Sequence, residues 1–223
     1  MTFFARTTAI AAIALSTVTA AYAATDPALD KTLRALDTAS AKFQSAEADL
    51  RWDQFEKVVR ETTSQYGSIY FLRKSGYTEM GATLTNKPGA APLKYLHFAN
   101  GKGYMYDTVS KKNTPFNAGQ DRARAESFLT LGFGGSGKDL EKAWTITQQG
   151  NETIDGVPTA KLDLVPKDPS VAQMFTHITL WVDTGRGISL KQLSYTPEGD
   201  TRTAFYTNIR YNTKVDTKKY AKH

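Results

Sequence analysis

The chain has 223 residues, of which 40% are hydrophobic and 22% charged, a balance typical of globular proteins and unlike disordered or fibrous chains. It contains no cysteine, which excludes disulfide scaffolds, thiol nucleophiles, iron–sulfur clusters and cysteine-bound zinc. The formal net charge of +6 is basic but modest, and eleven tyrosines, eleven phenylalanines and three tryptophans favour β-structure or a large apolar surface.

Residues 1–23 have the organisation of a secretory signal peptide. Arg6 supplies the positive start, residues 8–18 form an apolar run, and Ala21-Tyr22-Ala23 matches a small-residue cleavage site. The run is shorter than the about 20 residues that a membrane-spanning helix needs. A frayed N-terminal helix is the alternative. We predict that residues 1–23 are removed on export, that residues 24–223 form a single soluble domain, and that no lipid anchor is attached, because no cysteine follows the cleavage site.

The first element expected in the exported chain is an amphipathic helix over residues 27–44. Asp26-Pro27 supplies an N-cap followed by proline at the first helical position. Apolar side chains then recur at helical spacing on one face, at Leu29, Leu33, Leu36 and Phe43.

From residue 47 the hydrophobic period changes from that of a helix to that of a strand. Leu50 and Trp52 alternate with charged residues, and the strand pattern continues to Val59 with a change of phase near Gln54-Phe55 that predicts a bulge. Asn100-Gly101 predicts a tight hairpin. Further strands are expected over residues 65–73, 77–85, 93–99, 103–107 and 113–116.

Residues 121–145 interrupt this pattern with helices, and strands then resume. A helix is expected over 121–131, ended by Gly132, and Ser136-x-x-Asp139 caps a short helical turn. Asp168-Pro169 opens another short helical turn. The later strands are expected over residues 144–149, 159–165, 176–183, 188–196 and 201–211.

These elements predict an α+β fold with about eleven antiparallel strands. A sheet this long curls to bury one face, either as a closed barrel or as an open sheet wrapped around its helices. Such a curled sheet can also enclose a cavity.

The glycine-rich segment 132–138 contains G-x-G-x-x-G and nearly matches a phosphate-binding loop. Asp139 stands where that loop needs a hydroxyl, and the segment follows a helical pattern inside antiparallel strands rather than opening a βαβ unit. We therefore do not expect nucleotide binding. The interpretation we adopt is a flexible connection between two short helices, suited to a moving lid.

No other motif indicates catalysis. G-x-S-x-G and H-E-x-x-H are absent, and His97 and His177 fall in strand patterns that favour structural roles. The C-terminal lysines, Lys214, Lys218, Lys219 and Lys222, are expected to form a solvated tail rather than a polyanion site. We expect no metal, no cofactor and no enzymatic activity.

Several segments follow one another in an order that points to a known family. After the N-terminal helix come Ser45-Ala46-Glu47-Ala48-Asp49-Leu50, a strand ending in Arg73, and an Asn-Gly-Lys hairpin leading to Tyr106-Asp107. The later segments are Phe128-Leu129-Thr130-Leu131-Gly132, Leu162-Asp163-Leu164-Val165-Pro166-Lys167, and residues 178–183 and 199–205. In this order and spacing nearly the whole exported chain resembles the LolA family of periplasmic lipoprotein carriers.

The resemblance implies an open, incomplete antiparallel barrel with a helical lid over an apolar concave face that holds acyl chains. It places Arg73 as the latch that holds the lid closed through hydrogen bonds, although Lys74 and Ser75 stand where the family often has proline. The expected cavity residues are Leu50, Trp52, Ile69, Phe71, Tyr104, Tyr106, Leu162, Leu164, Ile178, Leu180 and Val182. The expected lid residues are Leu33, Leu36, Phe128, Leu131, Met174 and Phe175.

The function that the resemblance implies is a periplasmic carrier that shuttles lipoproteins from the inner to the outer membrane. Each buried acyl CH2 contributes about 0.8 kcal/mol, so a lipid-anchored protein needs such a carrier to cross an aqueous gap. The implied partners are acylated lipoproteins, an inner-membrane lipoprotein-releasing ABC transporter and an outer-membrane acceptor, with no nucleic acid, and we expect a monomer. The alternatives are an envelope lipid-binding sensor or regulator on the same fold, as in RseB-like proteins, a carrier of another lipid, and an exported enzyme with an unrecognised site.

Overall fold

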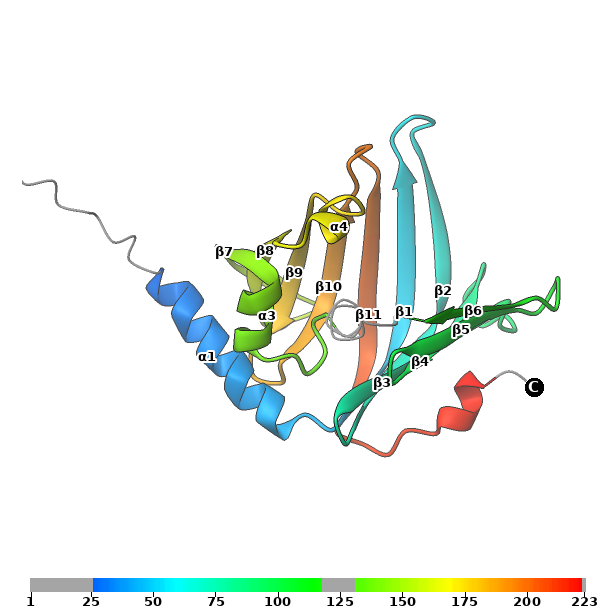
Figure 1. Cartoon of the computed structure of the whole chain (residues 1–223), viewed down its shortest axis with the longest axis horizontal. Coiled ribbons are helices and arrows are strands. Elements are labelled where there is room, and N and C mark those ends of the chain that lie inside the picture. The colour runs from blue at the N-terminus through cyan, green and yellow to red at the C-terminus, as the bar shows by residue number, and fades with distance from the viewer. Residues whose placement is uncertain (1–25, 118–130, 222–223) are drawn as a thin grey trace, which may run out of the picture.

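The computed structural model describes residues 26–117 and 131–221. One antiparallel sheet of eleven strands organises them, in the order β6-β5-β4-β3-β2-β1-β11-β10-β9-β8-β7 (Figure 1). In the described part of the chain, β6 and β7 are the two edges and do not pair, so the sheet stays open. The prediction of an α+β fold built on an open antiparallel sheet is confirmed.

The helices are few and short apart from the first. The strands are β1 (Ser45–Glu56), β2 (Glu61–Lys74), β3 (Tyr77–Thr85), β4 (Lys94–Ala99), β5 (Lys102–Asp107), β6 (Asn113–Asn117), β7 (Trp144–Ile154), β8 (Val157–Pro166), β9 (His177–Asp183), β10 (Ile188–Tyr195) and β11 (Thr201–Tyr211). The helices are α1 (Pro27–Lys42), α3 (Gly137–Ala143), α4 (Pro169–Ala172) and the 3-10 turn η2 (Thr217–Tyr220). No helix within these ranges has the length and apolarity that crossing a membrane requires.

The predicted caps begin each of the three α-helices in the described part of the chain. The Asp26 carboxylate accepts from the Ala28 amide at 2.9 Å and Pro27 starts α1, which ends two residues earlier than expected because Phe43 is extended. The Ser136 hydroxyl accepts from the Asp139 amide at 3.1 Å at the start of α3. Asp168 caps α4 in the same way.

Two strand predictions need correction. β1 ends at Glu56 rather than continuing to Val59, and residues 57–60 form the turn into β2. The pairing of β1 is regular through Gln54 and Phe55, and its irregularity lies between Glu47 and Asp49 instead. The phase of the hydrophobic pattern changes because Gln54, near the end of β1, is a polar residue on the same face as Leu50 and Trp52.

The β7–β8 hairpin is longer than its sequence indicated. β7 extends to Ile154 through a polar stretch and an irregular pairing between Gln148 and Asn151, which hid the strand alternation. Asp155 and Gly156, both at positive φ, make the turn.

The helices in the described part of the chain lie over one half of the concave face. Figure 1 shows α1, α3 and α4 beside β7–β10, while β3–β6 curve away on the other side. α1 contacts α3 and β7, and α4 contacts β8. The core is accordingly divided: a helix-side cluster centred on Leu36, Leu162, Leu164 and Leu180, and a strand-side cluster centred on Phe71, Met80, Phe98 and Phe133.

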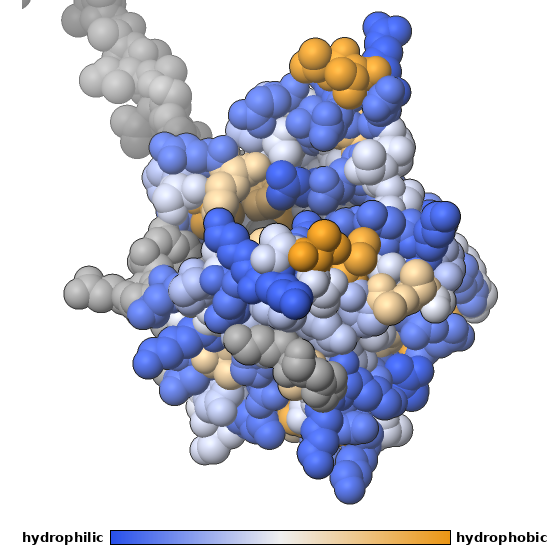
Figure 2. Space-filling model, turned by 90° about the vertical axis from the view of Figure 1, so that its right-hand side faces the viewer, coloured by the Kyte–Doolittle hydropathy of each residue, from blue (hydrophilic) through white to orange (hydrophobic). Residues whose placement is uncertain are grey.

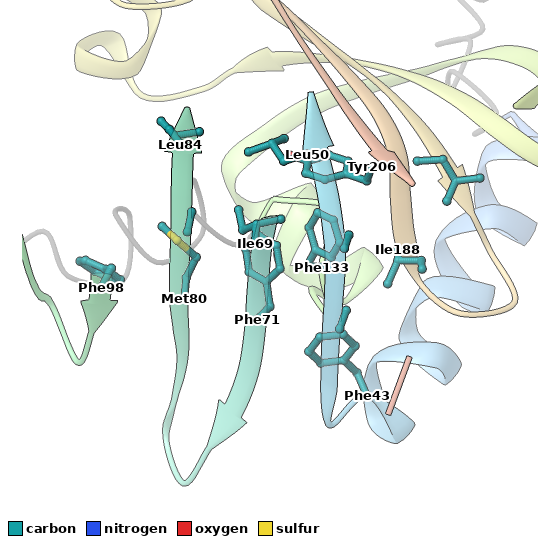
Figure 3. Close-up of a cluster of buried hydrophobic side chains, with 14 residues drawn as sticks. Phe43, Leu50, Ile69, Phe71, Met80, Leu84, Phe98, Phe133, Ile188 and Tyr206 are labelled. Atoms are coloured by element: carbon teal, nitrogen blue, oxygen red, sulfur yellow. The ribbon is translucent and has the colours of Figure 1, made fainter. Parts of the chain in front are cut away.

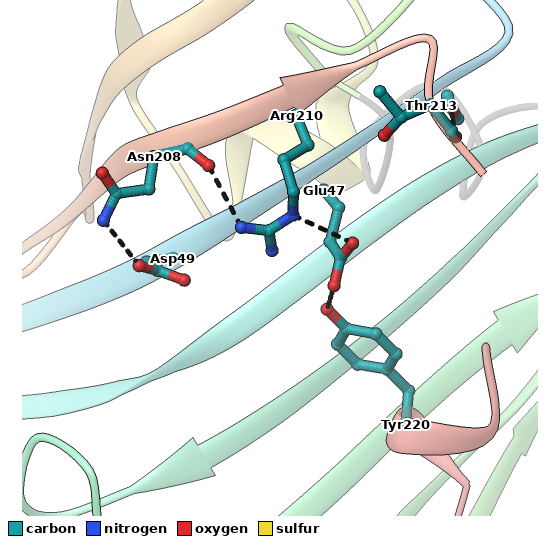
Figure 4. Close-up of polar contacts among 7 residues, drawn as sticks. Glu47, Asp49, Asn208, Arg210, Thr213 and Tyr220 are labelled. Atoms are coloured by element: carbon teal, nitrogen blue, oxygen red, sulfur yellow. Dashed lines mark hydrogen bonds and ion pairs between the residues drawn. The ribbon is translucent and has the colours of Figure 1, made fainter. Parts of the chain in front are cut away.

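The C-terminal segment docks on the convex face, behind the strand-side cluster (Figure 4). The Tyr220 hydroxyl donates to Glu47 Oε1 at 2.8 Å, and Arg210 Nε donates to Glu47 Oε2 at 3.1 Å. The Tyr220 ring packs edge-on against Tyr70, with centroids 4.7 Å apart. Lys214, Lys218 and Lys219 are exposed as expected, but the segment is anchored by a buried tyrosine and is not a free tail; Lys222 lies outside the described residues.

Glycine at position 81 makes room for this anchor. A Cβ there would lie 2.4 Å from the Tyr70 ring and 3.2 Å from Tyr220 Cβ. The Tyr70 ring and Tyr220 therefore approach β3 closely, on the side opposite its buried Met80 and Ala82.

The anchor predicts how acid affects stability. Burial disfavours the charged form of Glu47, but hydrogen bonds from Arg210 and Tyr220 outweigh it and hold the pKa of Glu47 below its ordinary 4.5. Ionised Glu47 therefore stabilises the folded state fully above pH 4.5, its ordinary pKa. This stabilisation is lost as pH falls through the lowered pKa of the folded state, because the unfolded state binds the proton more readily.

We therefore expect Glu47→Gln to lower the free energy of unfolding by about 1.5–3 kcal/mol at neutral pH and to flatten its fall on acidification. Urea unfolding at several pH values measures both effects. Glu56→Gln, at an exposed carboxylate, is the matched control. An equally steep acid dependence in Glu47→Gln and the wild type would contradict this account.

Candidate functional site

A cavity of about 250 Å3 lies between the strand-side half of the sheet and the covered half. Its walls are mainly aliphatic and aromatic, which suits an apolar ligand. One wall consists of Leu50, Trp52, Ile69, Phe71, Met80, Ala82, Leu84 and Leu96, from β1 to β4. The other consists of Leu131, Phe175, Ile178, Gln192, Ser194, Arg202, Ala204 and Tyr206.

Strand alternation and register bring the first wall together. Ile69 pairs with Ala82 and Phe71 pairs with Met80, so their side chains share the concave face. Leu50 reaches the same face from β1 (Figure 3). The wall is thus a continuous apolar surface.

Phe133 fills the space at one end of this wall. Its ring stacks on Phe71 with centroids 4.0 Å apart and meets the edge of Tyr206 at 4.8 Å (Figure 3). Phe133 is 1% exposed although it belongs to a connecting segment, not to a strand of the sheet. It therefore occupies volume that an apolar ligand entering from the cavity would compete for.

Backbone contacts hold the segment of Phe133 on β10. The Ser189 amide donates to the Gly132 carbonyl at 2.6 Å, and the Gln192 side chain donates to the Leu131 carbonyl at 2.6 Å. Phe133 itself forms an isolated bridge with Ile188.

Arg73 joins this segment to α1 and β2. Its guanidinium donates to the Ser40 carbonyl at 2.9 Å and to the Gly134 carbonyl, and it lies 5.5 Å from the Phe43 ring centroid. The Ser40 hydroxyl also donates to the Gly134 carbonyl, at 2.7 Å. One arginine at the end of β2 thus ties the end of α1 to residues 131–136, the connecting segment over this end of the cavity, which we call the cover.

Polar side chains gather on the β10–β11 side of the cavity. Ser194 and Arg202 pair across these strands, and the Arg202 guanidinium lies 5.9 Å from the Phe175 ring centroid. Arg202 is exposed, so a positive charge stands at the rim of an otherwise apolar cavity. Tyr206 is buried in the wall, and burial raises the pKa of its hydroxyl, which stays neutral.

The glycine-rich segment is a close-packed contact in its described part rather than a loose connection, which corrects our expectation. A Cβ on Gly134 would lie 2.3 Å from the Phe43 ring, and one on Gly137 would lie 2.4 Å from the Leu33 carbonyl oxygen. Gly132 and Gly134 also adopt positive φ. These glycines let the cover approach α1 and β10.

The structure brings together part of the predicted cavity lining. Leu50, Trp52, Ile69, Phe71 and Ile178 line the cavity. The other aliphatic candidates, Leu162, Leu164, Leu180 and Val182, are on the same sheet but pack in the helix-side cluster beneath α3 and α4.

Tyr104 and Tyr106 lie on the opposite face of the sheet. Tyr104 pairs with His97, and Tyr106 pairs with Tyr95. His97 in turn pairs with Gly81, whose neighbours Met80 and Ala82 face the cavity, so this row is convex. In Gly103-Tyr104-Met105-Tyr106 the aromatic residues alternate with Gly and Met, and this pattern does not indicate which of the two sets faces the cavity.

The predicted lid residues are also divided. Leu131 and Phe175 line the cavity, whereas Leu33 and Leu36 are buried where α1 packs on the sheet and α3. Met174 is 52% exposed and does not cover the cavity. Phe128, together with the helix expected over 121–131, falls outside the described residues apart from Leu131.

Sequence reasoning missed about half of the wall. Met80, Ala82 and Leu84 alternate clearly in β3 and could have been chosen by the rule that selected Ile69 and Phe71. Gln192, Ser194 and Arg202 could not, because polar residues in an apolar wall leave no hydrophobic pattern.

Within the described ranges, no group of three or more His, Asp or Glu residues could hold a metal ion. His97 stacks on Tyr104 and lies 3.7 Å from Glu79, while His177 stacks on Tyr195 and lies 4.0 Å from Asp163. Both histidines are outside the cavity lining.

Comparison with known proteins yields structural likeness only. No protein-family model and no curated protein sequence matches the chain. MucB has a TM-score of 0.54 at 13% identity, over 89% of this chain and 64% of MucB. An uncharacterised conserved protein from Thermus thermophilus has a TM-score of 0.54 at 8% identity, over 88% of this chain and 94% of that one. A LolA superfamily protein from Nitrosomonas europaea has a TM-score of 0.41 at 12% identity, over 87% and 97%.

At these identities the likeness shows the fold. The chain has the fold of MucB and of the Thermus thermophilus protein, which in this chain is an open antiparallel sheet partly covered by helices. It spans 64% of the length of MucB.

The close contact at Gly134 generates a stability prediction. Gly134→Ala should lower the free energy of unfolding by about 1–3 kcal/mol, because the new methyl group would overlap the Phe43 ring and the backbone has a φ of 75°. Urea unfolding measures the change. Gly135→Ala is the control, since a Cβ there meets nothing within 4 Å, and it should change stability by less than about 0.5 kcal/mol. Equal effects at the two positions would show that the cover is not packed as described.

Proposed function

We propose that this protein is a periplasmic carrier that binds the acyl chains of lipoproteins in its cavity and shuttles them from the inner to the outer membrane. The observation that carries the proposal is the cavity, an apolar space between an open sheet and a helical cover, with one polar side. The predicted signal peptide, residues 1–23, supports export of the chain, and we propose that residues 24–223 act as a single domain.

The energetics of lipid transfer fit such a cavity. Each acyl CH2 withdrawn from water contributes about 0.8 kcal/mol, so a few buried CH2 groups hold a chain firmly. The rings of Phe133 and Phe71 are already in contact where the cavity ends. Deeper entry of an acyl chain then requires Phe133 to withdraw, and the lost aromatic contact offsets part of the binding free energy and favours later release.

Arg73 is placed to couple this withdrawal to the cover. Its hydrogen bonds to the Ser40 and Gly134 carbonyls fix the cover against β2, two residues from Phe71 in the cavity wall. Displacing Phe133 moves the adjacent Gly134 carbonyl away from the guanidinium. We propose that Arg73 is the latch of the empty carrier.

The proposed activity is non-enzymatic, and the proposed partners are acylated lipoproteins, an inner-membrane releasing transporter and an outer-membrane acceptor, with the carrier monomeric. The second candidate is a lipid-binding regulator. The observation that favours a regulator as the second candidate is the likeness to MucB, a protein whose structure was also solved in complex with MucA from Pseudomonas aeruginosa.

The decisive experiment uses membranes that contain an active lipoprotein-releasing transporter and a labelled triacylated lipoprotein. The exported protein is added, and the soluble fraction is analysed for a one-to-one complex. Release supports the carrier. Binding of free lipids without lipoprotein release would reject it in favour of a regulator or a carrier of another lipid.

The latch makes a separate prediction. Arg73→Leu should accept lipoprotein as the wild type does but transfer it to acceptor membranes about ten-fold less, because losing charged hydrogen bonds worth about 1.5–3 kcal/mol to the closed state favours the loaded state. Labelled lipoprotein in carrier and acceptor fractions measures both steps. Lys74→Leu is the control, since Lys74 pairs with Glu79 on the convex face. Unchanged transfer by Arg73→Leu would remove the latch from the proposal.

A further inference from the structure

The exposed apolar side chains of this protein are concentrated at one end of its strands. In the described part of the chain, the large hydrophobic residues that face solvent are Val58 (92% exposed), Val59 (56%), Val109 (77%), Val165 (45%) and Met174 (52%). They lie in the β1–β2 turn, in the β5–β6 turn, near the end of β8 and just after α4. The strand order assigns both turns to the same end of the strands, and the curl of the sheet directs the β1–β2 turn upward and the β5–β6 turn to the right in Figure 1.

The two turns are poorly suited to being only connections. Lys57-Val58-Val59-Arg60 contains no glycine, proline, asparagine or aspartate, the residues that favour turns, and β-branched valine favours strands. Arg60 adopts a φ of 55°, a conformation that is uncommon for such residues. In the β5–β6 turn Lys111 does the same, again beside an exposed valine. The β1–β2 turn thus keeps β-branched residues that turn formation alone does not call for, and the β5–β6 turn, although Asp107 and Ser110 favour a turn, also has an exposed valine and a positive φ.

The β1–β2 turn is nevertheless held firmly. The Lys57 amide donates to the Asp200 carboxylate at 2.9 Å, which ties this turn to the β10–β11 turn. A Cβ on Gly199 would lie 2.7 Å from Lys57 Cδ, so the two turns pack closely. The valines are thus presented to solvent by a braced hairpin.

Positive charge flanks the valines at both turns. Lys57 and Arg60 enclose Val58 and Val59, and Lys111 and Lys112 follow Val109. Within the described ranges none of these cations forms an ion pair. Figure 2 shows hydrophobic groups at its top, at the height of the β1–β2 turn, and near its centre, each bordered by hydrophilic residues.

Most nearby carboxylates are set back from the tips or already accept hydrogen bonds, whereas Glu198, in the β10–β11 turn that packs on Lys57, is exposed. Glu56 and Glu61 face each other at the strand ends, one position behind Lys57 and Arg60. Asp107 accepts hydrogen bonds from the Val109 and Ser110 amides of its own turn. The outermost positions therefore combine aliphatic groups with free cations.

We propose that the β1–β2 and β5–β6 turns form a membrane-contact rim, in which Val58, Val59 and Val109 enter the headgroup region of a bilayer and the flanking cations bind anionic lipid phosphates. Aliphatic tips bordered by lysine and arginine match the layered chemistry of a bilayer surface, which is anionic outside and apolar beneath. A protein partner would need complementary pockets for two separate turns. The rim does not depend on which lipid the cavity carries.

The test is flotation of the exported protein with preformed vesicles at low ionic strength. One vesicle set contains phosphatidylglycerol in phosphatidylethanolamine, and the other is phosphatidylcholine alone. The wild type should float with the anionic set and far less with the neutral one. The double variant Val58→Asp/Val59→Asp should lose at least about ten-fold in partition coefficient. Each of Arg60→Gln and Lys111→Gln should lose about five-fold on anionic vesicles only.

Val165→Asp is the control for a single added charge, because it places one aspartate at an exposed valine outside both turns; it should partition as the wild type does, whereas the single variant Val58→Asp should partition less. Urea unfolding of every variant should be unchanged, since the altered side chains are exposed. No flotation of the wild type, or equal partitioning of the double variant and the control, would overturn the rim. If the valine variant instead lost binding only to membranes containing a partner protein, the turns would be a protein-docking surface and the proposal would also fall.

Discussion

An apolar concave face on an open sheet has to be covered by something other than strands, and the rest of this structure depends on that constraint. The strand order leaves β6 and β7 as edges, so pairing cannot close the sheet. α1, α3 and α4 cover the β7–β10 half, where leucines from the strands pack beneath them. Over the β1–β4 half, the described chain supplies mainly Phe43 and Phe133. Among the described residues, the cavity therefore lies where the cover is thinner, a mismatch between a long sheet and the helices described over it.

The same mismatch explains why so much of the polar chemistry concentrates at one end of β2. The connecting segment has backbone groups to satisfy, and it meets β10 on one side and Arg73 on the other. Burying one of these backbone groups without a partner would cost about 1–3 kcal/mol. The hydrogen bonds from β10 and Arg73 avoid this cost while the segment is in place. Within the described ranges this segment is thus held by a few directional hydrogen bonds and by the contacts of the Phe133 ring with Phe71 and Tyr206.

The sequence predicts the fold better than the site. Hydrophobic periodicity indicates which residues of a strand are buried, but it does not indicate which face of the sheet is concave. The strands β3 and β11 were predicted to the residue, and the caps of α1, α3 and α4 follow from Asp26, Ser136 and Asp168. Tyr104 and Tyr106 show the limit, since a strand with aromatic residues on one face and Gly103 and Met105 on the other gives no sign of which face is concave. Leu162 and Leu180 show another, because lining a cavity and packing under a helix require the same residues. Gln192 and Arg202 became visible only through the register of β10 and β11.

The convex face indicates which part of the molecule can yield when the cavity fills. Pairing of β1 with β11 joins the two halves of the sheet, and a row of alternating cations and aromatic rings crosses that junction. The Arg51 guanidinium lies 4.1 Å from the Phe205 centroid, and Lys191 Nζ lies 4.2 Å from that of Trp181. Trp181 also donates to Glu152 at 2.6 Å, which extends the row to β7. Separating β1 from β11 would break this row together with the strand pairing, whereas withdrawing Phe133 breaks a stack and a few hydrogen bonds. For the proposed carrier, expansion of the cavity through the cover therefore costs less than expansion through the sheet.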